Sequence, residues 1–188
     1  MAGPMQKTGE EKEAAQVRQF AGLMLDFHKA QYAYAQELNK QGGAGKPASA
    51  TKKAYDAECR KVEAFALGHV QLLRRMLEIS LTGEHVDLDG RHLGLSEGDR
   101  KALQVIDGIK GAEYAASARM TLHSGLWPEP TRIMLSAKTK TGVVDLFSFY
   151  YGGKEASGKT GNVALYPSDW VYEQVGRSQL GSVPKKVQ

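Results

Sequence analysis

The sequence contains a single cysteine, Cys59, and this scarcity excludes two kinds of site. One thiol cannot form a disulfide within the chain, and it cannot supply the several sulfur ligands of a structural zinc centre. Cys59 recurs at helical spacing with apolar residues, so we interpret it as a small buried hydrophobic residue rather than a reactive thiol. The sequence therefore predicts no disulfide, no metal centre and no cofactor.

Long apolar runs are also missing. No segment approaches the roughly 18 consecutive apolar residues that a membrane-spanning helix needs. Residues 1–15 are polar and charged, and they lack the apolar core of a secretory signal. With 41% hydrophobic and 24% charged residues, the composition is that of a soluble globular protein. We expect a cytoplasmic location by default, although a mature exported domain would give the same pattern.

The sequence also lacks catalytic signatures. The five histidines form no H-x-H, H-x-x-x-H or H-E-x-x-H pattern, and no G-x-S-x-G nucleophile motif occurs. An enzyme would therefore have to assemble its catalytic residues by folding alone. The sequence leaves enzymatic activity open and favours a non-enzymatic role.

One motif matches a phosphate-binding pattern. Residues Gly153–Thr160, GKEASGKT, fit G-x-x-x-x-G-K-[ST] letter for letter. In a working loop of this kind a helix follows, and its N-terminus attracts the phosphates. Here Gly161, Asn162 and soon Pro167 follow, and these residues do not begin a helix. We interpret the segment as a flexible loop, and whether it binds an anion stays open.

The charge of the chain raises the question of nucleic acid. The net charge is +4 and the isoelectric point is about 9.1. A surface that follows a phosphate backbone needs clustered positive charge. The basic residues of segment 51–82 spread around the expected helix, and acidic residues interrupt them. We therefore do not expect a nucleic-acid partner.

Apolar residues at helical spacing predict three long helices. The first covers residues 8–40, and Thr8 and Glu11 at its start have the form of a capping box. The second covers residues 51–82, with Ser49 or Thr51 as its cap, and the third covers residues 97–124, with Ser96 as its cap. Helices of this length need partners for their apolar stripes in water. We expect them to pack as an antiparallel, bundle-like set with coiled-coil character.

Four glycines lie inside the expected helices: Gly22, Gly68, Gly108 and Gly111. Each costs roughly 0.5–1 kcal/mol relative to alanine, so each needs a compensating reason. Close approach of neighbouring helices is the interpretation we prefer, and a kink is the alternative.

Other segments have the period of two that is typical of strands. Residues 84–95 alternate around Asp89-Gly90 and predict a short ribbon between the second and third helices. Residues 132–139 and 143–151 predict a hairpin joined by Lys140, Thr141 and Gly142. A third strand is expected near residues 162–166, and a short helix is expected over Trp170–Arg177.

The expected fold class is α+β. It consists of three long antiparallel helices, the ribbon at 84–95, a small C-terminal antiparallel sheet and a short terminal helix. The boundaries that we expect are a tail at 1–7, a helical bundle at 8–126, a β/α element at 127–178 packed on the bundle, and a tail at 179–188.

Helical faces are a common basis for protein–protein contact. The leading hypothesis is a non-enzymatic interaction or structural-assembly module that binds a protein partner or a second copy of itself. The alternative is a small-ligand-binding or enzymatic domain with a pocket between the C-terminal aromatic strand and the helices. The candidate lining residues of that pocket are Trp127, Phe147, Phe149, Tyr151, Tyr166 and Trp170. His28 and Glu63 fall opposite each other in the expected helical hairpin and form a possible polar pair.

Overall fold

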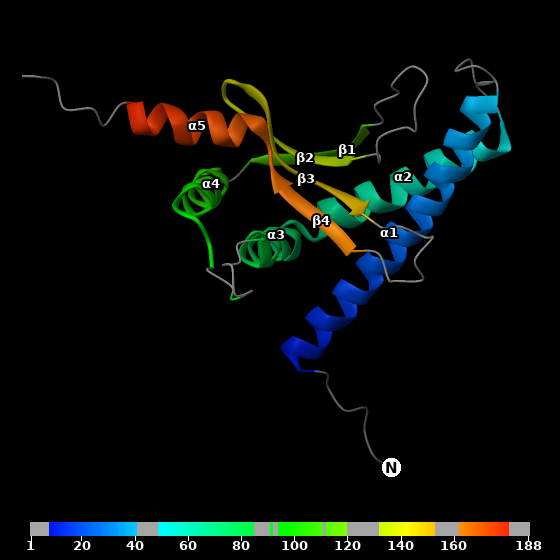
Figure 1. The fold of residues 1–188 in the computed structure, drawn as a ribbon, viewed down its shortest axis with the longest axis horizontal. Coiled ribbons are helices and arrows are strands. Elements are labelled where there is room, and N and C mark those ends of the chain that lie inside the picture. Colours follow the sequence, from blue (N-terminus) through cyan, green and yellow to red (C-terminus); the bar gives the residue numbers. More distant parts are fainter. Residues whose placement is uncertain are drawn as a thin grey trace, which may run out of the picture.

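The computed structural model describes residues 8–40, 49–84, 91, 94–110, 112–119, 132–152 and 162–180. Within these residues, five helices and a four-stranded antiparallel sheet confirm the α+β class. In chain order the elements are α1 (Gly9–Lys40), α2 (Ala50–Gly68), α3 (Val70–Glu84), α4 (Glu97–Gly108), β1 (Glu113–Arg119), β2 (Arg132–Thr139), β3 (Gly142–Gly152), β4 (Asn162–Pro167) and α5 (Asp169–Leu180). In Figure 1, α1 and α2 form a helical hairpin, and α4 and α5 lie side by side.

Polar caps begin the helices where the sequence predicts them. At the start of α1, Thr8 Oγ1 accepts the backbone N–H of Glu11 at 3.3 Å, and the Glu11 carboxylate accepts the backbone N–H of Thr8 at 3.0 Å. Ser49 and Ser96 each accept the backbone N–H three residues further on, at 3.1 and 3.0 Å. These side chains satisfy N–H groups that have no partner inside the helix, so helix starts can be predicted from local sequence alone.

The prediction of one continuous helix over residues 51–82 is wrong. The helix ends at Gly68, and α3 begins at Val70 after His69, whose φ and ψ are −135° and 34°. Glycine has a low helix propensity, and the His69 ring nitrogen Nδ1 forms a 2.9 Å hydrogen bond with the Phe65 carbonyl oxygen. The break allows α3 to change direction and to pack against β4. The three long antiparallel rods are therefore not present.

The third predicted helix, over residues 97–124, is also shorter than expected. It ends at Gly108, and residues 113–119 form the edge strand β1. Three side chains of β1 alternate toward the core, namely Tyr114, Ala116 and Ala118. Alanine favours a helix in isolation, but pairing with β2 along the whole strand overrides this propensity.

The glycines fit the alternative interpretation better than the preferred one. Gly68 ends α2 and Gly108 ends α4, and a Cβ atom added at either would meet no atom within 4 Å. Close approach of helices within the chain is therefore the wrong reason for these two glycines. Gly22 lies inside the unbroken α1, and its surroundings are equally open.

The predicted ribbon over residues 84–95 lies mostly outside the described residues. Glu84 is the last residue of α3, and residues 94–96 have no regular secondary structure. The expected tail at 1–7 and the loop Gly153–Thr160 also lie outside the described residues. The terminal helix α5 is longer than the predicted Trp170–Arg177 and extends into the segment 179–188 that was expected to be a tail.

The sheet confirms the predicted hairpin and third strand. Its order is β1-β2-β3-β4, and every neighbouring pair is antiparallel. Lys140 and Thr141 connect β2 to β3, and Gly142 has a φ of +131°, which glycine tolerates better than other residues. The sheet thus forms a simple meander from β1 to β4.

The aromatic side chains of β3 divide between the two faces of the sheet. A β-bulge between Leu135 and Ser136 shifts the register of β2 and β3. Phe147 and Phe149 face the helices and are fully buried. Tyr150 points to the opposite face, where its ring stacks on Tyr166 with centroids 6.1 Å apart.

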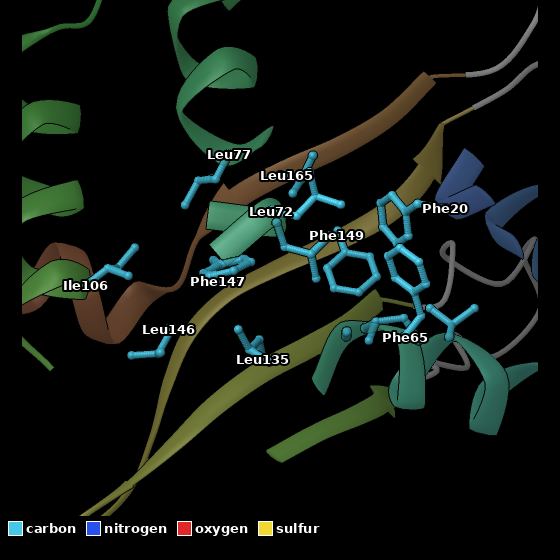
Figure 2. Close-up of a cluster of buried hydrophobic side chains, with 14 of the residues drawn as sticks. Phe20, Phe65, Leu72, Leu77, Ile106, Leu135, Leu146, Phe147, Phe149 and Leu165 are labelled. Atoms are coloured by element: carbon cyan, nitrogen blue, oxygen red, sulfur yellow. The ribbon is translucent and has the colours of Figure 1, made fainter. Parts of the chain in front are cut away.

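One aromatic cluster joins the helical hairpin to the sheet. Phe20 of α1 stacks on Phe65 of α2, and it meets the ring of Phe149 edge-on, with both centroid distances at 5.3 Å. Figure 2 shows these rings beside Leu135 and Leu165 of the sheet. Because the same rings belong to α1, α2 and β3, helices and sheet share one hydrophobic core.

The opposite face of the sheet carries a charged cluster. The guanidinium of Arg119 donates two hydrogen bonds to Asp145, at 2.8 and 3.0 Å, and Ser136 donates a third at 2.7 Å. Partial burial acts to raise the pKa of Asp145, but the hydrogen bonds from Arg119 and Ser136 outweigh it and hold the pKa below its usual value. The carboxylate therefore fastens β1 and β2 to β3.

Candidate functional site

An apolar groove lies between α1 and α3, and residues of β3 and β4 form its floor. We call it the α1–α3 groove, and its volume is about 690 Å³. Its lining residues are Val17, Phe20, Ala21, Gly22 and Leu25 of α1, Met76, Ile79 and Ser80 of α3, Tyr151 of β3, and Val163 and Leu165 of β4. A second hollow of about 520 Å³ lies along α3 and shares Ile79 with the groove.

Helix α1 has two apolar stripes. One is the buried stripe that begins with Phe20, which we call the core stripe, and the other forms a wall of the groove. Val17, Ala21 and Leu25 recur every four residues on the adjacent face of the helix, so they form a continuous ridge along it. Val17 and Leu25 are half-buried, Ala21 is exposed, and all three line the groove.

The wall on α3 contains the most exposed large hydrophobic residue of the described chain. Leu73 and Leu77 anchor α3 in the core with no exposed surface, whereas Ile79 is 71% exposed. Single exposed hydrophobic residues are common on protein surfaces. Ile79 differs because it stands between two hollows, so its exposure is part of a continuous apolar surface.

The N-terminal part of α1, Gly9–Gln19, is an extension that touches the core at Val17. None of the side chains from Gly9 to Gln19 is buried. Among the described residues, one ion pair links this part to the rest of the chain: Arg75 of α3 donates to Glu13 at 3.0 Å. Short helical segments are marginal in water without a packing partner, and an exposed ion pair contributes at most about 1 kcal/mol. The extension therefore offers a helical face that the described chain leaves uncovered.

The groove has little chemistry beyond its apolar surface. Among its lining residues, only Ser80 and Tyr151 carry side-chain oxygen atoms. No group of three histidine, cysteine, aspartate or glutamate side chains within the described residues could hold a metal ion. A third hollow, of about 350 Å³, contains Arg74, but Asp107 accepts two hydrogen bonds from this guanidinium at 2.7 and 2.8 Å. The groove is suited to binding by shape and apolar contact.

The structure separates the aromatic residues that were predicted to line one pocket. Phe147 and Phe149 belong to the core, and Tyr166 lies on the opposite face of the sheet. Trp170 is half-buried in the first turn of α5, and Trp127 lies outside the described residues. Tyr151 does line the α1–α3 groove, and His28 of α1 packs against its ring with centroids 4.8 Å apart.

Glu63 has a structural neighbour on the sheet edge. Its carboxylate accepts a 2.8 Å hydrogen bond from the backbone N–H of Ala118 in β1. Strand β1 is at the edge of the sheet, where backbone groups without a partner strand could pair with another chain. Glu63 therefore satisfies one backbone N–H of this edge, that of Ala118. A direct pair between Glu63 and His28 stays a prediction.

Sequence reasoning missed most of the groove residues. The ridge of Val17, Ala21 and Leu25 lies beside the core stripe, and the two merge into one broad apolar face in the sequence pattern. Ile79 lies off the stripe of Leu73 and Leu77, which is the available signal that it faces solvent. The floor of the groove is formed by β3 and β4, which are distant in sequence from α1 and α3. Tertiary packing brings these segments together, and no local sequence pattern predicts it.

Cys59 is buried, and its chemistry follows from that burial. Desolvation is the largest cause that raises the pKa of the thiol, from 9.0 to about 11, and a hydrogen bond with Tyr55 offsets part of the effect. We expect Cys59 to react with a chromogenic disulfide reagent roughly 100-fold more slowly in the native protein at pH 8 than in denaturant, because two pKa units change the thiolate fraction by that factor. Equal rates would show that the thiol is accessible and ionised normally.

The same shift has a consequence for stability. Between pH 9 and pH 11 the thiol of the unfolded chain ionises while the native thiol stays protonated. The unfolded state is then favoured, so this group lowers the free energy of unfolding as the pH rises through that range. Denaturant titrations at several pH values, with Cys59→Ala as the control, measure this contribution.

In the described part of the chain, no helix is both long enough and apolar enough to cross a membrane. Comparison with protein-family models, with curated proteins and with solved structures gives no match to this chain.

Proposed function

We propose that this chain is a non-enzymatic protein–protein interaction module that binds an amphipathic helix in the α1–α3 groove. The observation that carries the proposal is the exposure of Ile79, at 71%, within an apolar surface that continues over α1, α3 and β4. Contiguous exposed apolar surface is costly in water and is typical of interaction sites.

A helix is the partner element that fits this surface best. Two helical walls present ridges of side chains, and a third helix packs into such ridges at a separation of about 8–10 Å. The apolar face of an amphipathic helix binds a groove through residues spaced three and four apart. The ridge of Val17, Ala21 and Leu25 recurs every four residues, which is one of these spacings, so the two faces are compatible.

A photo-crosslinking experiment tests this proposal. We expect the photoreactive amino acid p-benzoylphenylalanine at position 79 to form a covalent adduct with a protein in cells that express the chain. The same amino acid at Gln19, an exposed position of α1 outside the ridge, should give no such adduct. The purified adduct partner should then bind the wild-type chain at least tenfold more tightly than the Ile79→Glu variant, a difference of about 1.4 kcal/mol. Equal adducts at both positions would contradict the proposal.

A small apolar ligand is the second candidate. Its support is the position of Tyr151, Val163 and Leu165 at the floor of the groove, close to the pocket expected between the C-terminal strands and the helices. The volume of about 690 Å³ is within the range of small-molecule sites. The lining supplies few polar groups to orient such a ligand, which favours the protein partner. An adduct with the mass of a small molecule at position 79 would reverse this preference.

A further inference from the structure

We propose that the groove binds α1 of a second copy of this chain, and that the two α1 helices cross antiparallel about a twofold axis at Ala21. This inference rests on the proposed docking role of the α1–α3 groove and names its occupant. It follows from the symmetry of the ridge, the glycine beside it and the charges along α1.

The ridge on α1 is self-complementary. Val17 and Leu25 lie at equal distances along the helix on either side of Ala21. In an antiparallel pair with its axis at Ala21, Val17 of one copy therefore meets Leu25 of the other, and the two Ala21 side chains meet each other. A twofold interface requires this property, because both copies use the same surface.

Gly22 indicates that another backbone comes close at this point. It is exposed in the interior of α1, and a Cβ atom there would meet no atom within 4 Å. Glycine at such a position costs roughly 0.5–1 kcal/mol relative to alanine. Nothing in the described chain compensates for this cost. Together with Ala21, Gly22 allows a second helix to approach α1 closely at the proposed axis.

The charges along α1 select the antiparallel arrangement. The first turns carry Glu10, Glu11 and Glu13, so a parallel pair would place these carboxylates against each other. Lys29 is exposed and has no ion-pair partner among the described residues. In the antiparallel pair, Lys29 of each copy lies near Glu10 and Glu13 of the other. The α1 helices then attract each other at both ends of the contact.

The proposed pair also covers the surfaces that the single chain leaves open. The extension of α1 from Gly9 to Gln19 gains a helix to pack against, and Ile79 of each copy meets the α1 helix of the other. The second hollow, which shares Ile79 with the groove, carries charges of both signs on Arg75 and Glu78, so two identical copies do not repel each other strongly there.

Oxidative crosslinking of the full chain tests the axis. We expect the Ala21→Cys variant to form a disulfide-linked dimer under mild oxidation. The matched control is Gln19→Cys, which places an exposed thiol two residues away on another face of α1. Wild-type Cys59 is buried and stays unreacted. Equal crosslinking of both variants would overturn the proposed axis.

Sedimentation equilibrium with charge-reversal variants tests the pairing. We expect a concentration-dependent dimer whose dissociation constant rises about tenfold or more in Ile79→Glu and in Gly22→Leu. Lys29→Glu should weaken the dimer, and adding Glu10→Lys in the same chain should restore it. Ala21→Glu serves as a second disrupting variant, and circular dichroism shows that each variant is folded. A dimer unaffected by these substitutions would overturn the inference.

The two proposals fail in different ways. If the chain is monomeric at all concentrations but forms an adduct with another protein at position 79, the proposed self-association is overturned. The docking role of the groove then stays in place. A monomeric chain without any adduct at position 79 overturns both.

Discussion

The Phe149→Ala variant is expected to lose about 3–5 kcal/mol of the free energy of unfolding. Phe149 has no exposed surface, and its ring meets Phe20 edge-on in the cluster that joins the helical hairpin to the sheet. Removing the ring leaves a cavity that three rigid elements border, and these elements cannot collapse together without losing other contacts. Urea titration followed by circular dichroism measures the loss.

The neighbouring residue provides a matched control. Tyr150 is also an aromatic residue of β3, but it lies on the opposite face of the sheet and contacts Tyr166 and Arg132 there. We expect Tyr150→Ala to cost roughly 1 kcal/mol, the range of an exposed aromatic or cation–π contact. Equal losses in the two variants would contradict the assignment of the two faces of β3.

The Asp99→Ala variant is expected to lose roughly 2–3 kcal/mol, because it removes a buried carboxylate that several groups bind. Asp99 is only 7% exposed and lies in the first turn of α4. It accepts hydrogen bonds from the Tyr172 hydroxyl of α5 at 3.0 Å and from the Ser96 hydroxyl at 2.6 Å. Its charge is also favourable at the positive end of the helix.

Two companion variants separate these contributions. Tyr172→Phe removes only the hydrogen bond between α4 and α5, so we expect a smaller loss of about 1 kcal/mol. Glu97→Ala removes an exposed carboxylate from the same helical turn, so we expect a much smaller change in stability than for Asp99→Ala. An Asp99→Ala variant as stable as Glu97→Ala would show that the link between α4 and α5 carries no stability.

The sequence predicts those parts of the fold that depend on local chemistry. The capping serines, the capping box at Thr8 and the turn at Gly142 form contacts within a few residues, so their patterns are sufficient. The break at Gly68 and the strand β1 could not be predicted in the same way. In both segments the helical pattern continues, and packing against distant strands decides the outcome.

The candidate site depends even more on tertiary structure. A bulge shifts the register of β2 and β3 between Leu135 and Ser136, and the sequence pattern does not predict it. Phe147 and Phe149 were expected to line a pocket, but in the structure they fill the core. The groove itself combines side chains from four elements, and only Tyr151 was expected to contribute.

The joint at His69 has a consequence for the groove. Helix α2 is fixed against α1 through Phe65 and Phe20, whereas α3 takes a different direction after His69. A straight continuation of α2 would carry Ile79 along the line of that helix and away from β4. The width of the α1–α3 groove at Ile79 therefore depends on the backbone conformation of His69, ten residues earlier in the chain. Substitutions at Gly68 or His69 would therefore change the width of the groove, and with it the partners that fit, without altering any residue that lines it.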